Sequence, residues 1–399
     1  MTGMTKNRRQ FIKSSSAIAT AAFFPFSILG SRPGDQVRVG VIGAGSRGQG
    51  LMRLMNSIDG LKVTAFSEII PFRIEEARSL AKDASSYRDY RNLLDRKDID
   101  AVVIATPFSM HAKMAVDALN AGKHVYCEKT MAKGISGIQK TIDSVKNSGK
   151  VFQTGHQYHS SPLYKKVVKM VNSDYLGEIT SFECQWNRNG NWRRTVPDPK
   201  WEKMINWRMY REYSGGLTAE LCSHQIDFIN WVLDETPVKI AGFGGIDHWK
   251  DGRETYDNIH QIFEYPSGVD ASFKCTTTNG FEDYKIRILG KKATVILDYS
   301  KADIYLENHY LKDYGMVDGV SGATKTAWKR GEGAPIEAGG SEDPTIDALK
   351  QFHSSIVEDA PVLSDVKTGA NTAKCVQMCL DAMYDEKIAY WQDYPELRF

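Results

Sequence analysis

Short apolar runs alternate with segments of helical periodicity through the first half of the chain. The runs are rich in β-branched residues, and an amphipathic segment follows each of them; one such helix is predicted over residues 135–147. Because strands that alternate with helices lie parallel in one sheet, the pattern predicts a doubly wound parallel sheet. The predicted strands are 37–42, 61–66, 101–105, 124–127 and 151–154.

The pattern changes after about residue 156. A predicted helix over 162–173 is followed by longer runs in which apolar and polar residues alternate. Such alternation is typical of strands that bury one face, so we expect an α+β domain with a large, mostly antiparallel open sheet. The glycine-rich segment 315–340 is predicted to be a loop, and helices resume near Pro344. The strands are expected at 179–186 and 269–276, both as antiparallel strands, and at 239–243, 259–265, 284–289 and 293–298.

The first 32 residues differ from both patterns. Arg8 and Arg9 stand just before Phe11, and a weakly apolar stretch follows over 17–29, which resembles a twin-arginine export signal. Pro25 interrupts this stretch, which is too short and too polar for a membrane span. We therefore predict export to the periplasm or beyond by the twin-arginine route; a basic, disordered N-terminus is the alternative.

Length and charge bound the remaining chain. A chain of 399 residues favours two domains, which we place at 35–155 and 156–399. Lys and Arg total 51 and Asp and Glu total 49, a balance that argues against a nucleic-acid partner and favours a small molecule. Six cysteines lack metal-ligand spacing, so no metal site is predicted; buried free thiols or disulfides both remain open.

A glycine-rich turn follows the first predicted strand. In Gly43-x-Gly45-x-x-Gly48 the first glycine allows a tight turn, the second lets a pyrophosphate approach the backbone, and the third permits close helix packing. The helix N-terminus would then face phosphate. The strand, turn and helix together predict a Rossmann dinucleotide-binding domain, with an unliganded turn as the alternative. The residues of the turn predicted to contact the cofactor are Gly43, Gly45, Ser46, Arg47 and Gly48.

Two further strand ends fit the same crevice. Glu68 follows the second strand, where a carboxylate would accept hydrogen bonds from ribose hydroxyls and repel a 2′-phosphate. NAD is therefore favoured over NADP, although Arg47 could contact a phosphate. Thr106 and Pro107 end another parallel strand and are predicted to contact the cofactor as well.

Several motifs resemble one known family. The runs 105–107 and 121–129, with His111 between them, and the segment 215–227 are similar to the glucose-fructose oxidoreductase, inositol dehydrogenase and MocA (Gfo/Idh/MocA) family. That family usually has Glu-Lys-Pro where this chain has Glu128-Lys129-Thr130. The resemblance implies a Rossmann domain, a second domain with an open sheet, and a homodimer or homotetramer built through that sheet.

The resemblance also implies an active site. Lys129 would line it beside the nicotinamide, His111 and Glu128 would lie at the cofactor, and Glu220 and His224 would project into one cleft. The family usually has aspartate at the position of Glu220, whose side chain is longer by one methylene.

Oxidation of an alcohol needs such groups. Removal of hydride from a carbinol carbon requires a base for the hydroxyl proton. His224, with an ordinary pKa near ~6.5, suits this task, and Lys129 would stabilise the alkoxide or act as the base if burial lowers its pKa. Glu220 would orient and tune them. A purely structural histidine is the alternative for His224.

Candidate substrate residues lie on either side of the domain boundary. The segment 187–207 is dense in tryptophan and arginine, which suits stacking on sugar rings, and we select Trp192 and Arg193 from it. Tyr158 and His159 follow the last predicted Rossmann strand. Packing in a subunit interface is the alternative for these aromatic residues.

Three functions remain open at this point. The favoured one is an oxidoreductase that acts on a ring hydroxyl of a sugar, glycoside or polyol and keeps its cofactor, because nicotinamide dinucleotide is not freely replenished outside the cell. A second is a redox-assisted glycosidase of the kind known among N-acetylgalactosaminidases that resemble this family. A third is a non-catalytic sugar-binding protein.

Overall fold

The computed structural model describes residues 36–307, 333–341 and 343–399. The predicted export signal lies outside the described residues, as does most of the predicted loop at 315–340. Within the described part of that loop, Ala334–Pro335 forms the short strand β14.

The first sheet has six parallel strands in the order β3-β2-β1-β4-β5-β6, which confirms the predicted doubly wound sheet. Strand β3 was not predicted, because it is a three-residue polar edge strand that pairs only with β2. The strands are β1 (Val37–Ile42), β2 (Leu61–Ser67), β3 (Ser85–Tyr87), β4 (Ala101–Ile104), β5 (His124–Cys127) and β6 (Phe152–Thr154).

Helices cover both faces of this sheet. One face packs against α2 (Ser46–Met55) and α11 (Pro344–Val357), and the other against α5 (His111–Asn120), α6 (Ile135–Ser148) and α12 (Val366–Tyr384). Burial on both faces explains why these strands are continuous apolar runs. Two shorter helices follow β2 and β3, namely α3 (Pro71–Leu80) and α4 (Tyr90–Leu94).

The second sheet has nine strands in the order β14-β13-β12-β11-β7-β10-β9-β8-β15. Most neighbours are antiparallel, as predicted. The two strands expected to be antiparallel, β7 and β10, are antiparallel to β11 and β9 respectively, but they pair in parallel with each other. Alternation reveals which residues face the core and says nothing of strand direction. The strands are β7 (Ile179–Asn187), β8 (Lys239–Gly245), β9 (Asn258–Glu264), β10 (Asp270–Thr276), β11 (Tyr284–Gly290), β12 (Ala293–Leu297), β13 (Ala302–Leu306) and β15 (Ala389–Tyr390).

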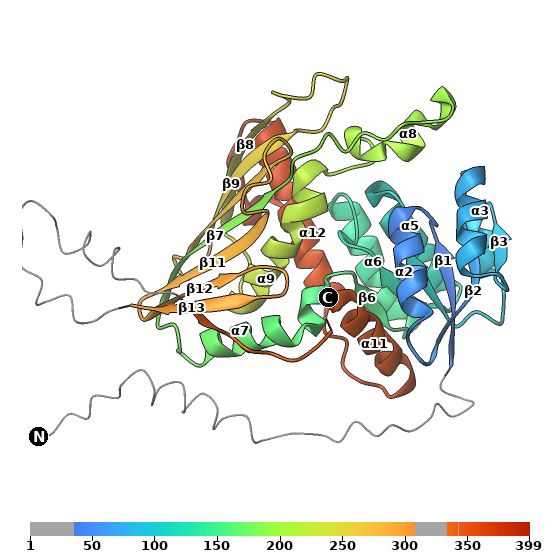
Figure 1. Ribbon diagram of the computed structural model, residues 1–399, viewed down its shortest axis with the longest axis horizontal. Helices are drawn as coiled ribbons and strands as arrows, with labels where there is room; N and C mark the ends of the chain where they lie inside the picture. The colour runs from blue at the N-terminus through green and yellow to red at the C-terminus, as the bar shows by residue number, and fades with distance from the viewer. Residues whose placement is uncertain (1–35, 308–332, 342) are drawn as a thin grey trace, which may run out of the picture. The chain divides into compact units, whose positions relative to one another are not determined.

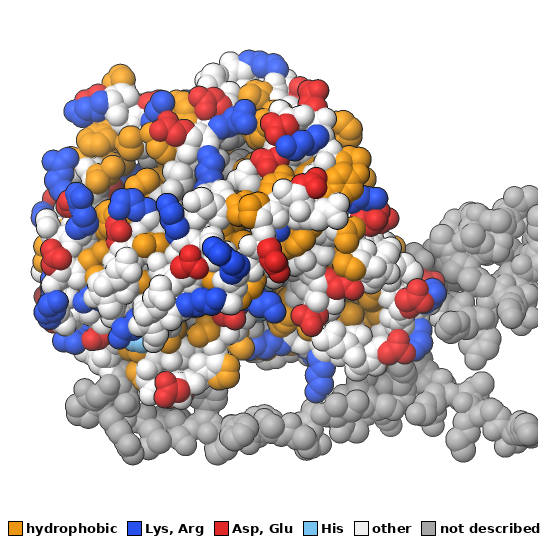
Figure 2. All heavy atoms as spheres, turned by 180° about the vertical axis from the view of Figure 1, so that it is seen from behind, with side chains coloured by type: hydrophobic (Ala, Val, Ile, Leu, Met, Phe, Trp, Pro, Cys, Tyr) orange, Lys and Arg blue, Asp and Glu red, His pale blue; other side chains and the backbone are white. Residues whose placement is uncertain are grey.

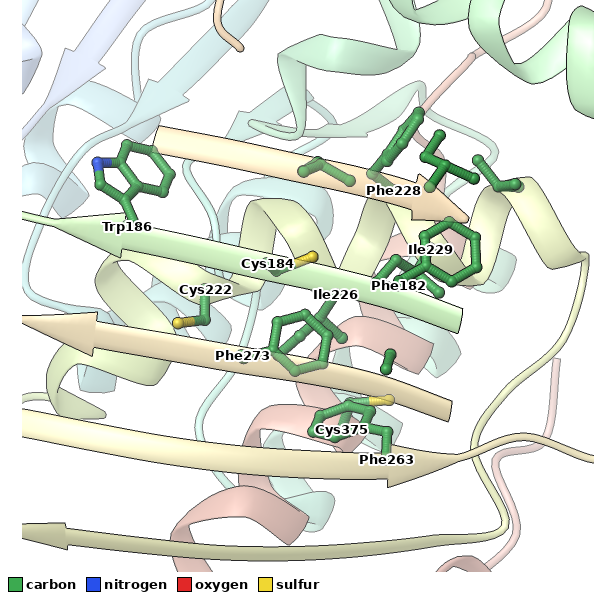
Figure 3. Packing of buried hydrophobic residues seen from close by; sticks show 14 of the residues in the cluster. Phe182, Cys184, Trp186, Cys222, Ile226, Phe228, Ile229, Phe263, Phe273 and Cys375 are labelled. Atoms are coloured by element: carbon green, nitrogen blue, oxygen red, sulfur yellow. The ribbon is translucent and has the colours of Figure 1, made fainter. Parts of the chain in front are cut away.

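Among the described residues, helices pack on one face of the second sheet. Phe182, Phe263 and Phe273 point from the strands toward Ile226 and Phe228 of α9 (Ser223–Leu233), as Figure 3 shows. Helix α7 (Pro162–Asn172) packs on the same face. Along β10 the outward residues alternate with buried ones and are exposed.

Helix α12 lies between the two sheets (Figure 1). It contributes to the core of the second sheet and to the core on one face of the first. Ala370 and Ala373 pack on the first sheet's core, whereas Cys375 and Val376 belong to the core of the second. All six cysteines are buried free thiols. On the face drawn in Figure 2, basic and acidic side chains are interspersed. In the described ranges, no helix is both long and apolar enough to cross a membrane.

Candidate active site

A pocket of about 1260 Å³ lies at the carboxyl ends of the parallel strands. Its first wall consists of residues that follow β1, β2, β4 and β5, and its second wall comes from segments 192–194, 203–208 and 220–224. Ligands of open α/β sheets bind at this edge. The predicted cofactor residues and the predicted catalytic residues therefore face one space.

The glycine turn has the geometry that the motif predicts. Gly43 has a φ of +89°, and a Cβ on Gly48 would lie 1.9 Å from the carbonyl oxygen of Gly43. A Cβ on Gly45 would meet nothing nearer than the guanidinium of Arg73, at 3.4 Å. The packing of the protein thus requires glycine at 43 and 48, whereas the open space at Gly45 fits a ligand that approaches the backbone.

Two polar side chains beside the turn fit the hydroxyls of a nucleotide. Oε1 of Glu68 accepts hydrogen bonds from the amides of Ile69 (2.8 Å) and Ile70 (3.0 Å). Its second carboxylate oxygen has no partner in the part of the chain that the structure describes. The Thr106 hydroxyl is buried and likewise unpartnered there, and Pro107 lies beside it on the pocket wall. A dinucleotide would satisfy these orphaned atoms.

Lys129 follows β5, and its peptide bond to Thr130 is cis. Its ammonium donates to the carbonyl oxygens of Glu220 (2.7 Å) and Ala219 (3.3 Å). Burial lowers the pKa of Lys129 below its usual value, and the negative charges of Glu220 and Glu128 oppose that shift. The geometry leaves one of the three ammonium hydrogens for a ligand.

His224 lies in the first turn of α9, directly after the π-helical segment Thr218–Cys222. Its side chain is 6% exposed, and its Nδ1 has no hydrogen-bond partner among the described residues. Burial, with the positive charge of Lys129 next, lowers the pKa of His224 well below 6.5. The imidazole is therefore neutral at physiological pH and able to accept a proton.

Glu220 engages Arg208, which was not predicted as a site residue. Oε2 of Glu220 accepts from Nε of Arg208 at 2.7 Å. Burial acts to raise the pKa of Glu220, but Arg208 and Lys129 outweigh it and hold that pKa below its usual value. Glu220 was expected to orient both catalytic groups. Its charge and its carbonyl act on Lys129, and no hydrogen bond joins its carboxylate to His224 in the described structure.

The remaining predicted cofactor residues brace the turn. Nε of Arg47 donates to Oε1 of Glu128 at 2.6 Å. The two ring nitrogens of His111 face the carbonyl oxygens of Thr106 (2.9 Å) and Thr130 (2.8 Å), so His111 ties the end of β4 to the loop after β5. Among the described residues, no cluster of three histidine, cysteine or acidic side chains could hold a metal ion.

Comparison with known families now identifies the chain. A family model described as "Oxidoreductase family, NAD-binding Rossmann fold" matches residues 37–156, and one described as "GFO/IDH/MocA C-terminal domain" matches residues 164–296. The chain belongs to the Gfo/Idh/MocA family. Its N-terminal domain is an NAD-binding Rossmann domain, as predicted from the glycine turn.

Individual relatives are more distant. Levoglucosan dehydrogenase of Pseudarthrobacter phenanthrenivorans is 25% identical over 341 residues, which span 78% of this chain and 84% of the relative. The 2,7-anhydro-N-acetylneuraminate hydratase of Escherichia coli is 26% identical over 66% of this chain and 68% of the relative. Inositol 2-dehydrogenase of Salmonella typhimurium is 30% identical, but the match spans 50% of this chain and only 55% of that enzyme.

A solved structure shares the fold of this Gfo/Idh/MocA oxidoreductase. A levoglucosan dehydrogenase in complex with NADH superposes with a TM-score of 0.72 at 19% identity, over 89% of this chain and 99% of the other.

The structure brings only two of the four predicted substrate residues to the pocket of this oxidoreductase. Trp192 and Arg193 line it, and Arg193 is held by Glu202 and by Asp251. Tyr158 and His159 do not. They belong to the 3₁₀ turn Gln157–Ser160, whose residue Gln157 faces the pocket instead.

Tyr158 and His159, which do not line the pocket, pack against other residues of the second domain. Tyr158 stacks on Tyr164 with ring centroids 4.1 Å apart. His159 bonds Asp227 at 2.9 Å and stacks on Trp231. A residue that directly follows a parallel strand is expected to lie near the ligand-binding edge of the sheet. In a 3₁₀ turn, with three residues per revolution, this position does not predict which side chain points into the pocket.

Several residues that line the pocket were not predicted as site residues from the sequence. Most belong to the aromatic and basic segment of the second domain, so their density in the sequence was a usable signal, while Arg73 on α3 carried none. They are Arg73, Gln157, Arg194, Lys203, Trp207, Arg208 and Tyr213.

Proposed function

We propose that the protein is an NAD-dependent dehydrogenase that oxidises a ring hydroxyl of a sugar, glycoside or cyclic polyol to a ketone. The observation that carries this proposal is the placement of a neutral, buried imidazole and a partly buried ammonium in the pocket that begins at the glycine turn. The relatives named as dehydrogenases of levoglucosan and inositol support the substrate class.

The two groups have different tasks. When bound, NAD would supply the hydride acceptor. His224, which burial keeps neutral, takes the proton of the substrate hydroxyl. Lys129, with two hydrogens held by backbone carbonyls, donates the third to the substrate oxygen and stabilises the negative charge that develops there. The backbone carbonyls of Ala219 and Glu220 hold this ammonium in place, and Arg208 fixes the carboxylate of Glu220 beside it.

Aromatic side chains suit a sugar substrate. Trp192 and Trp207 line the outer part of the pocket, and the guanidinium of Arg208 stacks over the ring of Trp207 at 4.2 Å. Flat apolar surfaces flanked by hydrogen-bond donors match the alternating faces and hydroxyls of a pyranose or cyclitol.

We further propose export and self-association. The arginine pair and weakly apolar stretch of residues 1–32 support export by the twin-arginine route. Phe243 and Ile262, which are 83% and 59% exposed, lie on the open face of β8 and β9 and support a homodimer or homotetramer through the second sheet. An exported enzyme of this kind would retain its cofactor through the catalytic cycle.

The test uses the protein as purified. Denaturation should release about one equivalent of nicotinamide dinucleotide per chain, and addition of sugars and cyclitols one at a time should change the absorbance of the reduced nicotinamide. A Lys129→Met variant that retains the nucleotide serves as the control. Absence of nucleotide, together with no uptake of added NAD, overturns the proposal.

A redox-assisted reaction is the second candidate, favoured by the likeness to a relative named a hydratase. In that reaction, transient oxidation at C3 acidifies C2, elimination expels the aglycone, and water and hydride return to the sugar. Release of p-nitrophenol from a nitrophenyl N-acetylgalactosaminide without net reduction of cofactor would establish it. A sugar-binding protein without catalysis would show neither signal, and its sugar affinity would be its only readout.

A further inference from the structure

The arginines that line the pocket fall into two groups. Arg47, Arg193 and Arg208 each donate a hydrogen bond to a carboxylate. Arg73 and Arg194 donate to none in the described parts of the chain; Arg88, which follows β3, shares this property. Cations that lie close together without a hydrogen-bonded carboxylate are unfavourable unless an anion joins them, so their position indicates where a negative charge binds.

Arg73 and Arg194 both border the glycine turn, and they come from different domains. Nη1 of Arg194, from the second domain, donates to the hydroxyl of Ser46 at 2.6 Å. Nη1 of Arg73, on α3, lies 3.4 Å from the point that a Cβ on Gly45 would occupy. The two guanidiniums therefore flank the open space that the glycine motif leaves for a diphosphate.

The electrostatics agree with this geometry. Burial lowers the pKa of Arg194, and the positive charges of Arg208 and Arg73 lower it further. Burial also lowers the pKa of Arg73, against the opposing effect of Glu68 and Glu76. Arg208 already has Glu220 as its partner, which leaves Arg73 and Arg194 as the repelling pair that a doubly charged diphosphate would relieve.

Arg194 is held in position without any ligand. Its backbone amide donates to Oδ1 of Asn206 (2.7 Å), and its carbonyl accepts from Nδ2 of the same side chain (2.9 Å). Asn206 is 2% exposed. Arg193, which precedes Arg194 in the sequence, donates a hydrogen bond to Asp251. A donor whose backbone is fixed beforehand loses little conformational entropy when it binds.

We propose that Arg194 and Arg73 form a two-arginine clamp on the diphosphate of the dinucleotide, and that Arg194 makes cofactor release slow. The clamp closes across the domain boundary, because Arg194 reaches from the substrate domain to the turn of the Rossmann domain. The alternative occupant is an acidic substituent of the substrate. Such a group would be expected near Lys129, whereas the two arginines lie at Gly45 and Ser46. This inference rests on the proposed retention of the cofactor.

The experiment measures release of NADH from the holoprotein by loss of its fluorescence in the presence of excess unlabelled NAD. Arg194→Ala and Arg73→Ala should each accelerate release by on the order of tenfold or more, because each removes a charge-assisted contact. Arg194→Lys should fall between. Arg78→Ala on α3 and Lys200→Ala in the Arg194 segment, both exposed and paired with their own carboxylates, serve as matched controls with wild-type release.

The outcomes separate this inference from the proposed function. If the wild-type protein holds no dinucleotide and binds none, the proposed function fails first. If it holds NADH and Arg194→Ala releases it at the wild-type rate, with an unchanged melting temperature, the clamp is overturned. Should Arg194→Ala lower the melting temperature of the nucleotide-free protein, Arg194→Lys and Arg194→Gln decide, since both keep the length of the side chain. A variant that keeps wild-type release but loses affinity for sugars would assign Arg194 to the substrate and refute the clamp.

Discussion

The two halves of the pocket are built in different ways. The cofactor half is shaped by backbone, at Gly43, Gly45 and Gly48, within one turn of the chain. The substrate half is shaped by side chains from distant segments, because Lys129 meets the backbone of Glu220, whose carboxylate meets Arg208. Binding at the glycine turn depends on the conformation of the backbone. Catalysis in the substrate half depends on the charges of its side chains. Substitutions should therefore affect the two halves through different observables.

The largest effect is expected in the cofactor half. Gly48→Ala places a Cβ 1.9 Å from the Gly43 carbonyl oxygen, so the turn must shift. We expect loss of bound NAD and a free energy of unfolding lower by about 1–3 kcal/mol, measured by denaturant titration and nucleotide content. The matched control is Gly45→Ala, which finds space in the protein and should weaken NAD binding while stability is kept. Equal loss of stability in both variants would contradict this account.

The next effect should be confined to the substrate half. His224→Gln and Lys129→Met should each lower kcat by about 10²–10⁴, because each removes a group that moves or stabilises the transferred proton. Nucleotide content and melting temperature should stay near those of the wild type. If either variant instead loses its NAD, the two halves are not separable in the way described.

The pH dependence follows from the protonation states of the two catalytic groups. Activity needs His224 neutral and Lys129 charged. The pKa of His224 is lowered well below 6.5, so the acid limb of kcat/KM should lie below pH 6.5. The pKa of Lys129 is lowered from 10.5, so activity should fall with rising pH before pH 10.5. Loss of the alkaline limb in Lys129→Arg would confirm the assignment, and an acid limb above pH 7 would refute it.

The smallest effect is expected from Glu220→Gln. The carboxylate of Glu220 raises the pKa of Lys129, so its removal should move the alkaline limb to lower pH. The acid limb, set by His224, should not move. Glu264→Gln on β9, a residue that does not line the pocket, controls for the general loss of one negative charge. A shift of the acid limb alone would show that Glu220 acts on the imidazole.

The same difference explains what the sequence could predict. The conformation of Gly43 and the crowding at Gly48 are local demands, so the motif was sufficient to place the turn. The ion pair of Arg208 with Glu220 depends on a fold that brings two segments together, and no spacing rule indicates it. Arg73 had no local signal either, because the sequence of helix α3 does not indicate which of its side chains face the pocket.

The fold divides along similar lines. Apolar runs predicted five of the six parallel strands, because both faces of that sheet are buried. Strand β3 is polar and short, and the parallel pairing of β7 with β10 depends on chain routing that residue alternation does not encode. Tyr158 and His159 were predicted to contact the substrate for a similar reason: their position in the chain was informative, and their side-chain direction was not.

Helices α11 and α12 have a consequence for how the protein is made. They follow most of the second sheet in the sequence, yet Leu349 and Ala370 pack against opposite faces of the first sheet. During translation the parts of those faces that α11 and α12 cover stay in contact with water until the ribosome has synthesised residues 344–384. We therefore expect the nascent N-terminal half to be unable to mature by itself, and nucleotide loading to follow completion of synthesis.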